Sequence, residues 1–200
     1  MTRSYELKKR AERQERTRQR IVEAAVALHG EIGPVRTTVS AIAERAGVER
    51  HTYYRHFPDD RSLFLACSGW FNEHHPMPDP ATWQPIADPQ ERLRHALGEL
   101  YDFYARNEQL MASVSRDEQV HALTAEVNAV HMGPAMAAMR ETLAAGLAEG
   151  PDARLVYAAL DLALAFATWR TLARISGLRE EEAATLMALA VVSAAALPGL

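Results

Sequence analysis

Long apolar runs are absent from this sequence, and cysteine occurs only once in 200 residues. No apolar run reaches the ~18 residues of a membrane-spanning helix, and the N-terminus is charged, unlike a signal peptide. The single Cys67 excludes an intramolecular disulfide and is typical of a reducing compartment. It lies on a mostly apolar segment, which favours a packed thiol over a redox sensor. We therefore expect a cytoplasmic protein with no membrane association.

Motifs of the common enzyme classes are also missing. There is no phosphate-binding glycine loop and no recognisable nucleophile motif. Of the eight histidines, His74 and His75 are adjacent and diverge on a helix, while His121 and His131 lie ten positions apart, a poor match to one helical face. We expect no metal and no other cofactor, and an all-α enzyme is the weaker alternative to a binding protein.

Charge is divided unevenly along the chain. Residues 1–61 hold 13 Lys and Arg against 9 Asp and Glu, a net charge of +4. Residues 62–200 hold 9 against 17, a net charge of −8. A basic N-terminal part on an acidic body suits a protein that turns one end toward a polyphosphate. We expect two domains with these bounds.

The segment Thr37–Phe57 has the pattern of two short helices joined by a tight turn. Thr38 can cap the first helix, apolar residues follow at helical spacing, and Gly47 can adopt the left-handed conformation of a sharp turn. Ala43 is small where the second helix must cross closely. These features predict a helix-turn-helix whose second helix lies in a DNA major groove, although spacing alone fits an ordinary helical hairpin equally well.

The residue identities favour DNA recognition. Thr38–Val48 (TVSAIAERAGV) and Thr52–Pro58 (TYYRHFP) resemble the DNA-binding signature of the tetracycline-repressor family, over roughly residues 17 to 65. The resemblance implies an all-α homodimer. It implies an N-terminal three-helix helix-turn-helix domain and a C-terminal helical domain for dimerisation and effector binding.

The second helix and its surroundings supply the predicted DNA contacts. The predicted DNA-binding residues are Thr38, Arg50, His51, Thr52, Tyr53, Tyr54, His56 and Arg61. Tyr54 and Phe57 are also expected to face inward and anchor the helix. Asp60 stands where the family usually has a phosphate-binding lysine. We expect Arg61 to replace that lysine, and Asp60 to cap the next helix or match its dipole.

Two further departures from the family pattern affect the expected contacts. Glu49 stands where a small capping residue is usual, and His51 stands where glycine or alanine is usual. They leave the domain identity intact.

Residues 1–20 carry 8 Lys and Arg against 3 Asp and Glu. They can extend the first helix, form a solvated tail, or form an arm that reaches DNA. Five of the ten prolines fall within Pro76–Pro89, which predicts a loop with Trp83 tucked onto the body. Further helices are expected at about 60–74, 89–106, 108–115, 118–148, 152–176 and 180–197, with Gly133-Pro134 breaking or kinking the fourth of these.

The last two helices are apolar on nearly every side, so they must be buried on several sides. Packing against the same helices of a second subunit explains this pattern; a wholly intramolecular core is the alternative. The predicted dimer-interface residues are Leu155, Leu162, Leu186, Leu189 and Val192.

Large apolar and flexible methionine side chains in the body suit a ligand pocket, although any one such residue is more often part of the hydrophobic core. The predicted ligand-binding residues are Trp70, Phe103, Met111, His121, Met132, Met136, Phe166, Trp169 and Arg170. Asp161 and Arg170 could orient a polar ligand group or form an ion pair. We expect a DNA-binding regulator, a repressor of a palindromic operator that responds to a small, largely apolar effector; a ligand-independent regulator is the alternative.

Overall fold

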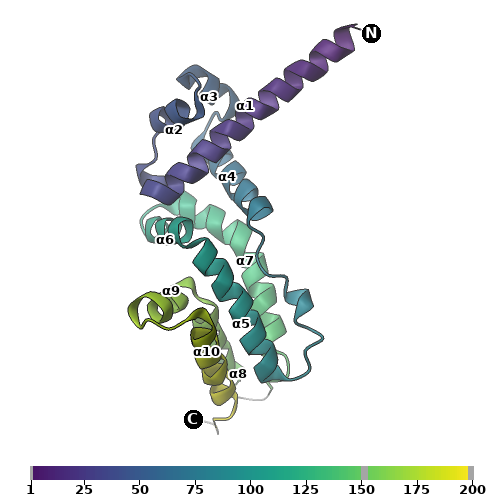
Figure 1. Cartoon of the computed structure of the whole chain (residues 1–200), viewed down its shortest axis with the longest axis vertical. Helices are drawn as coiled ribbons and strands as arrows, with labels where there is room; N and C mark the ends of the chain where they lie inside the picture. Colours follow the sequence, from purple (N-terminus) through teal and green to yellow (C-terminus); the bar gives the residue numbers. More distant parts are fainter. Residues whose placement is uncertain (1, 150–152, 198–200) are drawn as a thin grey trace. The chain divides into compact units, whose positions relative to one another are not determined.

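The computed structural model describes residues 2–149 and 153–197, with side chains from Tyr5 onward. Every regular element among these residues is helical (Figure 1). The elements are α1 (Thr2–Ile32), η1 (Pro34–Arg36), α2 (Val39–Ala46), α3 (Arg50–His56), α4 (Asp60–His74), η2 (Pro80–Thr82), α5 (Pro89–Arg106), α6 (Glu108–Asp117), α7 (Ala122–Ala144), α8 (Ala153–Leu164), α9 (Phe166–Arg170), η3 (Thr171–Ile175) and α10 (Glu180–Ala195). The predicted all-α fold is confirmed.

The chain forms two compact units. The first holds the chain up to Pro76 together with Gln109–His131, and the second holds Met77–Glu108 and the chain from Met132 onward. Helix α7 therefore begins in the first unit and ends in the second. The predicted boundary between a DNA-binding domain (residues 1–61) and an effector-binding and dimerisation domain (residues 62–200) stays a prediction, because the division into compact units does not show what each part does.

Helices α1 to α4 share one hydrophobic core in the first unit. Its buried members are Ile21, Val22, Ala24, Ala25, Leu28, Ile42, Ala46, Tyr53, Phe57, Leu63 and Cys67. Burial raises the pKa of the Cys67 thiol to about 12, which keeps it protonated at neutral pH. The predicted packed thiol is confirmed.

The turn between α2 and α3 forms as its sequence predicts. The Thr38 hydroxyl accepts the Ala41 N–H at 3.2 Å, capping α2. Gly47 has a φ of 63°, and its N–H donates to the carbonyls of Ala43 and Glu44. Ala43 is 3% exposed, in keeping with the predicted need for a small side chain at the crossing.

Helix α4 begins at the predicted residue, and of the two roles predicted for Asp60, cap or dipole match, the structure agrees with the second. The Asp59 carboxylate accepts the Ser62 N–H at 2.7 Å, so Asp59 is the cap. Asp60 lies in the first helical turn, where a negative charge matches the helix dipole.

In the second unit, α8 and α10 pack against α5 and against each other. Trp83, from the proline-rich loop, is 0% exposed, and its indole N–H donates to the Glu99 carboxylate at 2.7 Å. The prediction that this tryptophan is tucked onto the body is confirmed.

The predicted single helix over 152–176 is wrong, because the chain leaves the helical path at Ala165, where ψ is 130°. A helix end leaves its last carbonyls without partners. Here the Tyr101 hydroxyl donates to the Ala163 carbonyl at 2.9 Å, and the Tyr104 hydroxyl donates to the Leu164 carbonyl at 2.5 Å. Two buried tyrosines on α5 therefore stabilise the break, which bends the path by 59°.

Of the break or kink predicted at Gly133-Pro134, the break is absent, since α7 continues through Pro134, and a kink there stays a prediction. Proline removes one helical hydrogen bond, to the carbonyl four residues earlier. Val130, at that position, lies on the exposed side of the helix, as Pro134 does, so water can replace the lost bond. Among the described residues no single helix could span a membrane; only α8 taken with residues 166–175, across the bend, has the length and composition.

Candidate DNA-binding and effector sites

Helix α3 has one exposed polar face and one buried aromatic face. The exposed side chains are those of Arg50, His51, Tyr54 and Arg55. Tyr53 and Phe57, four residues apart on the other face, are each 1% exposed. The prediction that Tyr54 faces inward is therefore wrong. Tyr54 is 46% exposed. Tyr53, which precedes it and lies about 100° around the helix, faces inward instead.

Two polar atoms of α3, the Tyr53 hydroxyl and Nε2 of His56, are buried without a hydrogen-bond partner among the described residues. Burial, and to a lesser extent the nearby Asp60 carboxylate, raise the pKa of Tyr53 to about 12. Burial, and to a lesser extent the charges of Arg55 and Arg18, lower the pKa of His56. Both side chains are therefore uncharged at neutral pH, and in this conformation Tyr53 belongs to the core rather than to the exposed face.

The polar side chains at the start of α3 are open to a partner. Arg50 is exposed and forms no ion pair with another described residue. Nε2 of His51 lies 3.3 Å from the hydroxyl of the half-buried Thr52. These side chains sit in the first turns of the helix, where base contacts of helix-turn-helix proteins concentrate. Direct contact with DNA stays a prediction for each of them.

Arg61 is engaged within its own unit. Its guanidinium lies 2.6 Å from one carboxylate oxygen of Glu126 on α7 and donates to the other at 2.8 Å. The hydrogen bond and charge of Arg61 lower the pKa of Glu126, which stays ionised at neutral pH. Both side chains are about half exposed. A DNA phosphate at Arg61 would therefore compete with an internal carboxylate, a partner that the sequence analysis did not predict.

The end of α6 docks on the connection between α1 and α2. The buried Asp117 carboxylate accepts the Val35 N–H at 2.9 Å and the Arg116 side-chain N–H at 2.8 Å. At the end of α1, Arg116 also donates to the Ile32 carbonyl, and the Ser113 hydroxyl donates to the Gly30 carbonyl at 3.0 Å. Burial alone would raise the pKa of Asp117, but the hydrogen bonds from Arg116 and Val35 outweigh it and lower the pKa.

Gly33 makes this docking possible. Its φ is +92°, and a Cβ at this position would overlap the Arg116 guanidinium and the Asp117 carboxylate. The sequence analysis indicated neither of these partners, because nothing local marks Asp117 as buried. We call this set of contacts the α6 clamp, consisting of Gly33, Val35, Ser113, Arg116 and Asp117.

The nine predicted ligand residues are divided between the two units. Trp70, Met111 and His121 belong to the first, and Phe103, Met132, Met136, Phe166, Trp169 and Arg170 belong to the second. In the first unit, the His121 ring lies 5.7 Å from that of Phe64, and Trp70 stacks on His74 at 4.1 Å. No single cluster contains all nine.

In the second unit, four aromatic rings gather where α5 meets α9. Phe166 and Trp169 lie 5.4 Å apart, and both rings pack within 6 Å of Tyr104. Phe103 lies 6.0 Å from Tyr104. The Trp169 indole N–H is buried and meets no hydrogen-bond acceptor within the described part of the chain. Phe166 and Trp169 thus lie together against the Tyr104 ring, which Phe103 also approaches, and the role of these three predicted residues in ligand binding stays a prediction.

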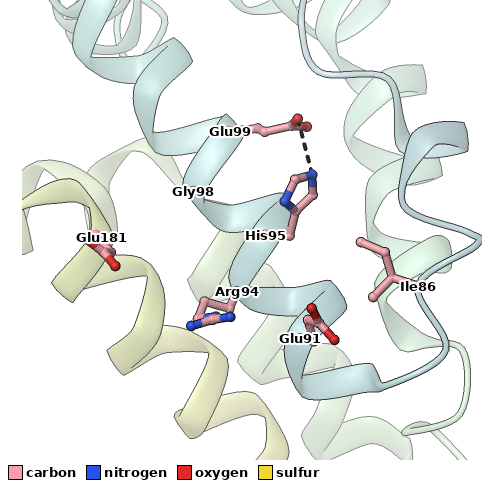
Figure 2. A pocket seen from close by; sticks show the side chains of 7 residues that line it. All are labelled: Ile86, Glu91, Arg94, His95, Gly98, Glu99 and Glu181. Carbon is pink, nitrogen blue, oxygen red and sulfur yellow. Dashed lines mark ion pairs between the residues drawn. The ribbon is translucent and has the colours of Figure 1, made fainter.

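A pocket in the second unit has a different character. Figure 2 shows it between α5, α10 and Ile86, with a volume of about 410 Å³. It is lined by Ile86, Glu91, Arg94, His95, Gly98, Glu99 and Glu181. Nε2 of His95 lies 3.4 Å from Glu99. The lining is mostly charged and includes none of the nine predicted residues, so it does not match the expected apolar effector.

The suggested ion pair between Asp161 and Arg170 does not form. Asp161 pairs with Arg140 on α7 at 2.5 Å, and Arg170 lies 3.9 Å from Glu108. Among the described residues there is also no group of three or more histidine, cysteine and acidic side chains that could hold a metal ion.

Helices α8 and α10 expose apolar side chains together. Leu162 is 61% exposed, Leu186 46% and Leu189 45%, while Leu155 and Val192 are half-buried. One face of each helix is covered within the subunit, and the other carries leucines in solvent. All five predicted interface residues are therefore exposed or half-buried on these two helices, and we call these five residues the leucine face.

Comparisons with known proteins address the domain as a whole. The family model described as "Bacterial regulatory proteins, tetR family" matches residues 21–67, which run from α1 through the turn into α4. The helix-turn-helix domain is that of a tetR-family regulator. This confirms the resemblance drawn from Thr38–Val48 and Thr52–Pro58, and the chain is a DNA-binding transcriptional regulator.

Similarity to other tetR-type proteins extends beyond this domain. The HTH-type transcriptional repressor NicS of Pseudomonas putida is 24% identical over 144 residues, which cover 70% of this chain and 68% of that protein. The structure of the regulator FadR from Bacillus subtilis in complex with stearoyl-CoA is 22% identical, with a TM-score of 0.62, and covers 88% of this chain and 98% of FadR. A TetR-like regulator from Rhodococcus sp. RHA1 is 20% identical, with a TM-score of 0.60 over 88% of this chain and 93% of that one. The two structures establish a shared fold.

Proposed function

We propose that the protein is a cytoplasmic homodimeric repressor that binds a palindromic DNA operator and responds to a small, largely apolar ligand. The exposed polar face of α3, within a helix-turn-helix domain of the tetR type, is the observation that carries the proposal. The protein would act by binding, without catalysing a reaction, and residues 1–61 would form the DNA-binding domain.

The exposed positions of the predicted set make the most direct contacts in this proposal. Arg50 and His51 would reach base edges early on α3, and Thr38 and Tyr54 would reach phosphates beside them. Two copies of α3, placed about one DNA turn apart by a dimer, would read the two halves of a palindrome.

Ligand control is supported by one relative and one cluster, and repression is supported by a second relative. NicS is named as a repressor, and the FadR structure contains stearoyl-CoA, a molecule with a long apolar chain. In this chain, Phe103, Phe166 and Trp169 offer an apolar aromatic site with one unpaired indole N–H. A ligand there would change DNA binding only if it bound one dimer geometry more tightly than another.

Selection of bound sequences from random duplexes tests the proposal. We expect a consensus of two inverted half-sites, from which the operator is then synthesised for titration. Stearoyl-CoA is the first effector probe, and a change in operator affinity on its addition would support ligand control. Recovery of no shared sequence, or of a single unrepeated half-site, would contradict the dimeric repressor.

A further inference from the structure

The first half of α1 stands clear of the domain that it belongs to. Helix α1 is 31 residues long, whereas the tetR-family match begins only at Ile21. Every side chain from Tyr5 to Arg16 is exposed, and in Figure 1 this part of α1 projects beyond α2 and α3. Folding of the domain core therefore does not explain the sequence of this segment.

Four basic residues form a stripe along this helix. Lys9, Arg13, Arg16 and Arg20 are spaced by four, three and four residues, which places them within an arc of roughly 60°. Within the described part of the chain, none of the four forms an ion pair with a carboxylate, although three glutamates lie on the same segment. Lys9 makes one internal contact, over the Tyr5 ring at 4.5 Å. We call these four residues the basic stripe.

The end of the recognition helix meets α1 on the side away from the stripe, because Arg18 lies about 140–180° around the helix from the four stripe residues. The Arg18 guanidinium lies over the Phe57 ring, 5.0 Å from its centre, at the end of α3. The charges of Arg18 and Glu15 also act on His56. At a rise of 1.5 Å per residue the stripe spans about 16 Å, and a DNA strand carries one phosphate per ~3.4 Å of axis. The stripe is long enough to meet several phosphates.

We propose that the basic stripe is a second DNA-binding surface, which holds phosphates that α3 does not reach. The inference rests on the proposed operator binding. A membrane surface is the other common partner of a basic helix, but it requires an apolar face opposite the charges. The only large apolar side chains of the exposed segment, Tyr5 and Leu7, lie about 160° apart around the helix. DNA fits the segment better.

Two matched variants of the full-length chain test the inference on the selected operator. Lys9→Gln with Arg13→Gln neutralises half of the stripe. Lys8→Gln with Arg10→Gln removes the same charges from adjacent exposed positions on other sides of the helix. Glutamine has nearly the helix propensity of lysine and arginine, so circular dichroism should show equal helicity in both.

We expect the stripe variant to flatten the slope of log affinity against log salt by about three to four units, since a dimer would lose four phosphate contacts at ~0.9 each. The selected consensus should not change, because phosphate contacts carry no sequence information. The off-stripe variant should change the slope by less than about one unit. Equal slopes for the two variants, or no loss in the stripe variant, would overturn the inference. A wild-type protein that selects no operator would overturn the proposed function as well.

Discussion

Tyr53 carries its hydroxyl into the core of the helix-turn-helix domain, where no acceptor among the described residues meets it. An unpaired buried hydroxyl costs ~1–3 kcal/mol. Tyr53→Phe removes this group and keeps the ring that packs on Phe57. We expect the free energy of unfolding, measured by thermal or urea denaturation, to rise by about 1 kcal/mol or to stay the same.

Operator titration separates this core role from the DNA contact that the sequence predicts for Tyr53. We expect Tyr53→Phe to bind the operator as the wild type does. The comparison variant is Arg50→Ala, on the exposed face of the same helix, which should lose ~1–3 kcal/mol of discrimination at particular base pairs. Weakened operator binding by Tyr53→Phe would show that the hydroxyl turns outward on DNA.

Arg61 has one carboxylate partner and one predicted phosphate partner. If DNA takes Arg61 from Glu126, Arg61→Ala should weaken binding to all sequences alike and flatten the salt slope by roughly two units for a dimer. Glu126→Gln should act in the opposite direction, tightening binding at low salt, because it frees the guanidinium. Both are measured by fluorescence anisotropy over a salt series. If Glu126→Gln has no effect while Arg61→Ala destabilises the fold, Arg61 serves only the internal ion pair.

At the scale of single elements, the α6 clamp fixes the connection that leads into α2. Gly33→Ala should destabilise the first unit, because it strains a positive φ and displaces the Asp117 carboxylate from the Val35 N–H. Two control glycines separate these causes. Gly47→Ala adds a Cβ at a φ of +63° with free space around it, and Gly69→Ala adds one within α4, also in free space.

We expect the cost in unfolding free energy to rise in that order. Gly69→Ala should be neutral or stabilise by up to ~1 kcal/mol, Gly47→Ala should cost about 1–2 kcal/mol, and Gly33→Ala should cost more. Thermal unfolding gives the ranking, and operator titration shows whether the clamp also sets the position of α2. Gly33→Ala costing no more than Gly47→Ala would mean that Arg116 and Asp117 move aside freely.

Elements whose signals are local were predictable from the sequence. The cap at Thr38, the left-handed Gly47 and the bounds of α4 and α5 all follow from residues within a turn of each boundary. The break at Ala165 was not predictable, because the tyrosines that stabilise it lie about 60 residues earlier on α5. Asp117 was missed for the same reason, since its burial depends on a distant connection.

Within the predicted sites, the sequence analysis could not determine which side of a helix faces the core. Tyr53 and Tyr54 are chemically alike, so no polar neighbour shows which of them faces inward; only packing on Phe57 decides it. The aromatic cluster of Phe103, Phe166 and Trp169 was predicted residue by residue, but the bend that helps to assemble it was not. Pair partners such as Arg140 for Asp161 depend on the packing of α7 beside α8, which composition does not encode.

At the scale of the whole molecule, the leucine face of α8 and α10 bears on whether the protein is a monomer or a dimer. Exposed leucines on two adjacent helices leave apolar area in water, which costs roughly 25 cal/mol per Å². A second copy of the same face would cover it in a symmetric, self-complementary contact. We therefore expect a dimer formed by α8 and α10 of both subunits.

Leu189→Glu tests this interface without disturbing the fold, because Leu189 is 45% exposed in the single subunit. A glutamate there is solvated in a monomer but would be buried and unpaired in the dimer, at severe cost in desolvation. We expect sedimentation to show a folded monomer, with affinity for the palindromic operator falling toward that for one half-site. The control is Val120→Glu, which adds the same charge at a side chain 79% exposed and off the leucine face; it should remain dimeric. If both variants sediment as dimers and bind the palindrome equally well, the subunits must join through another surface.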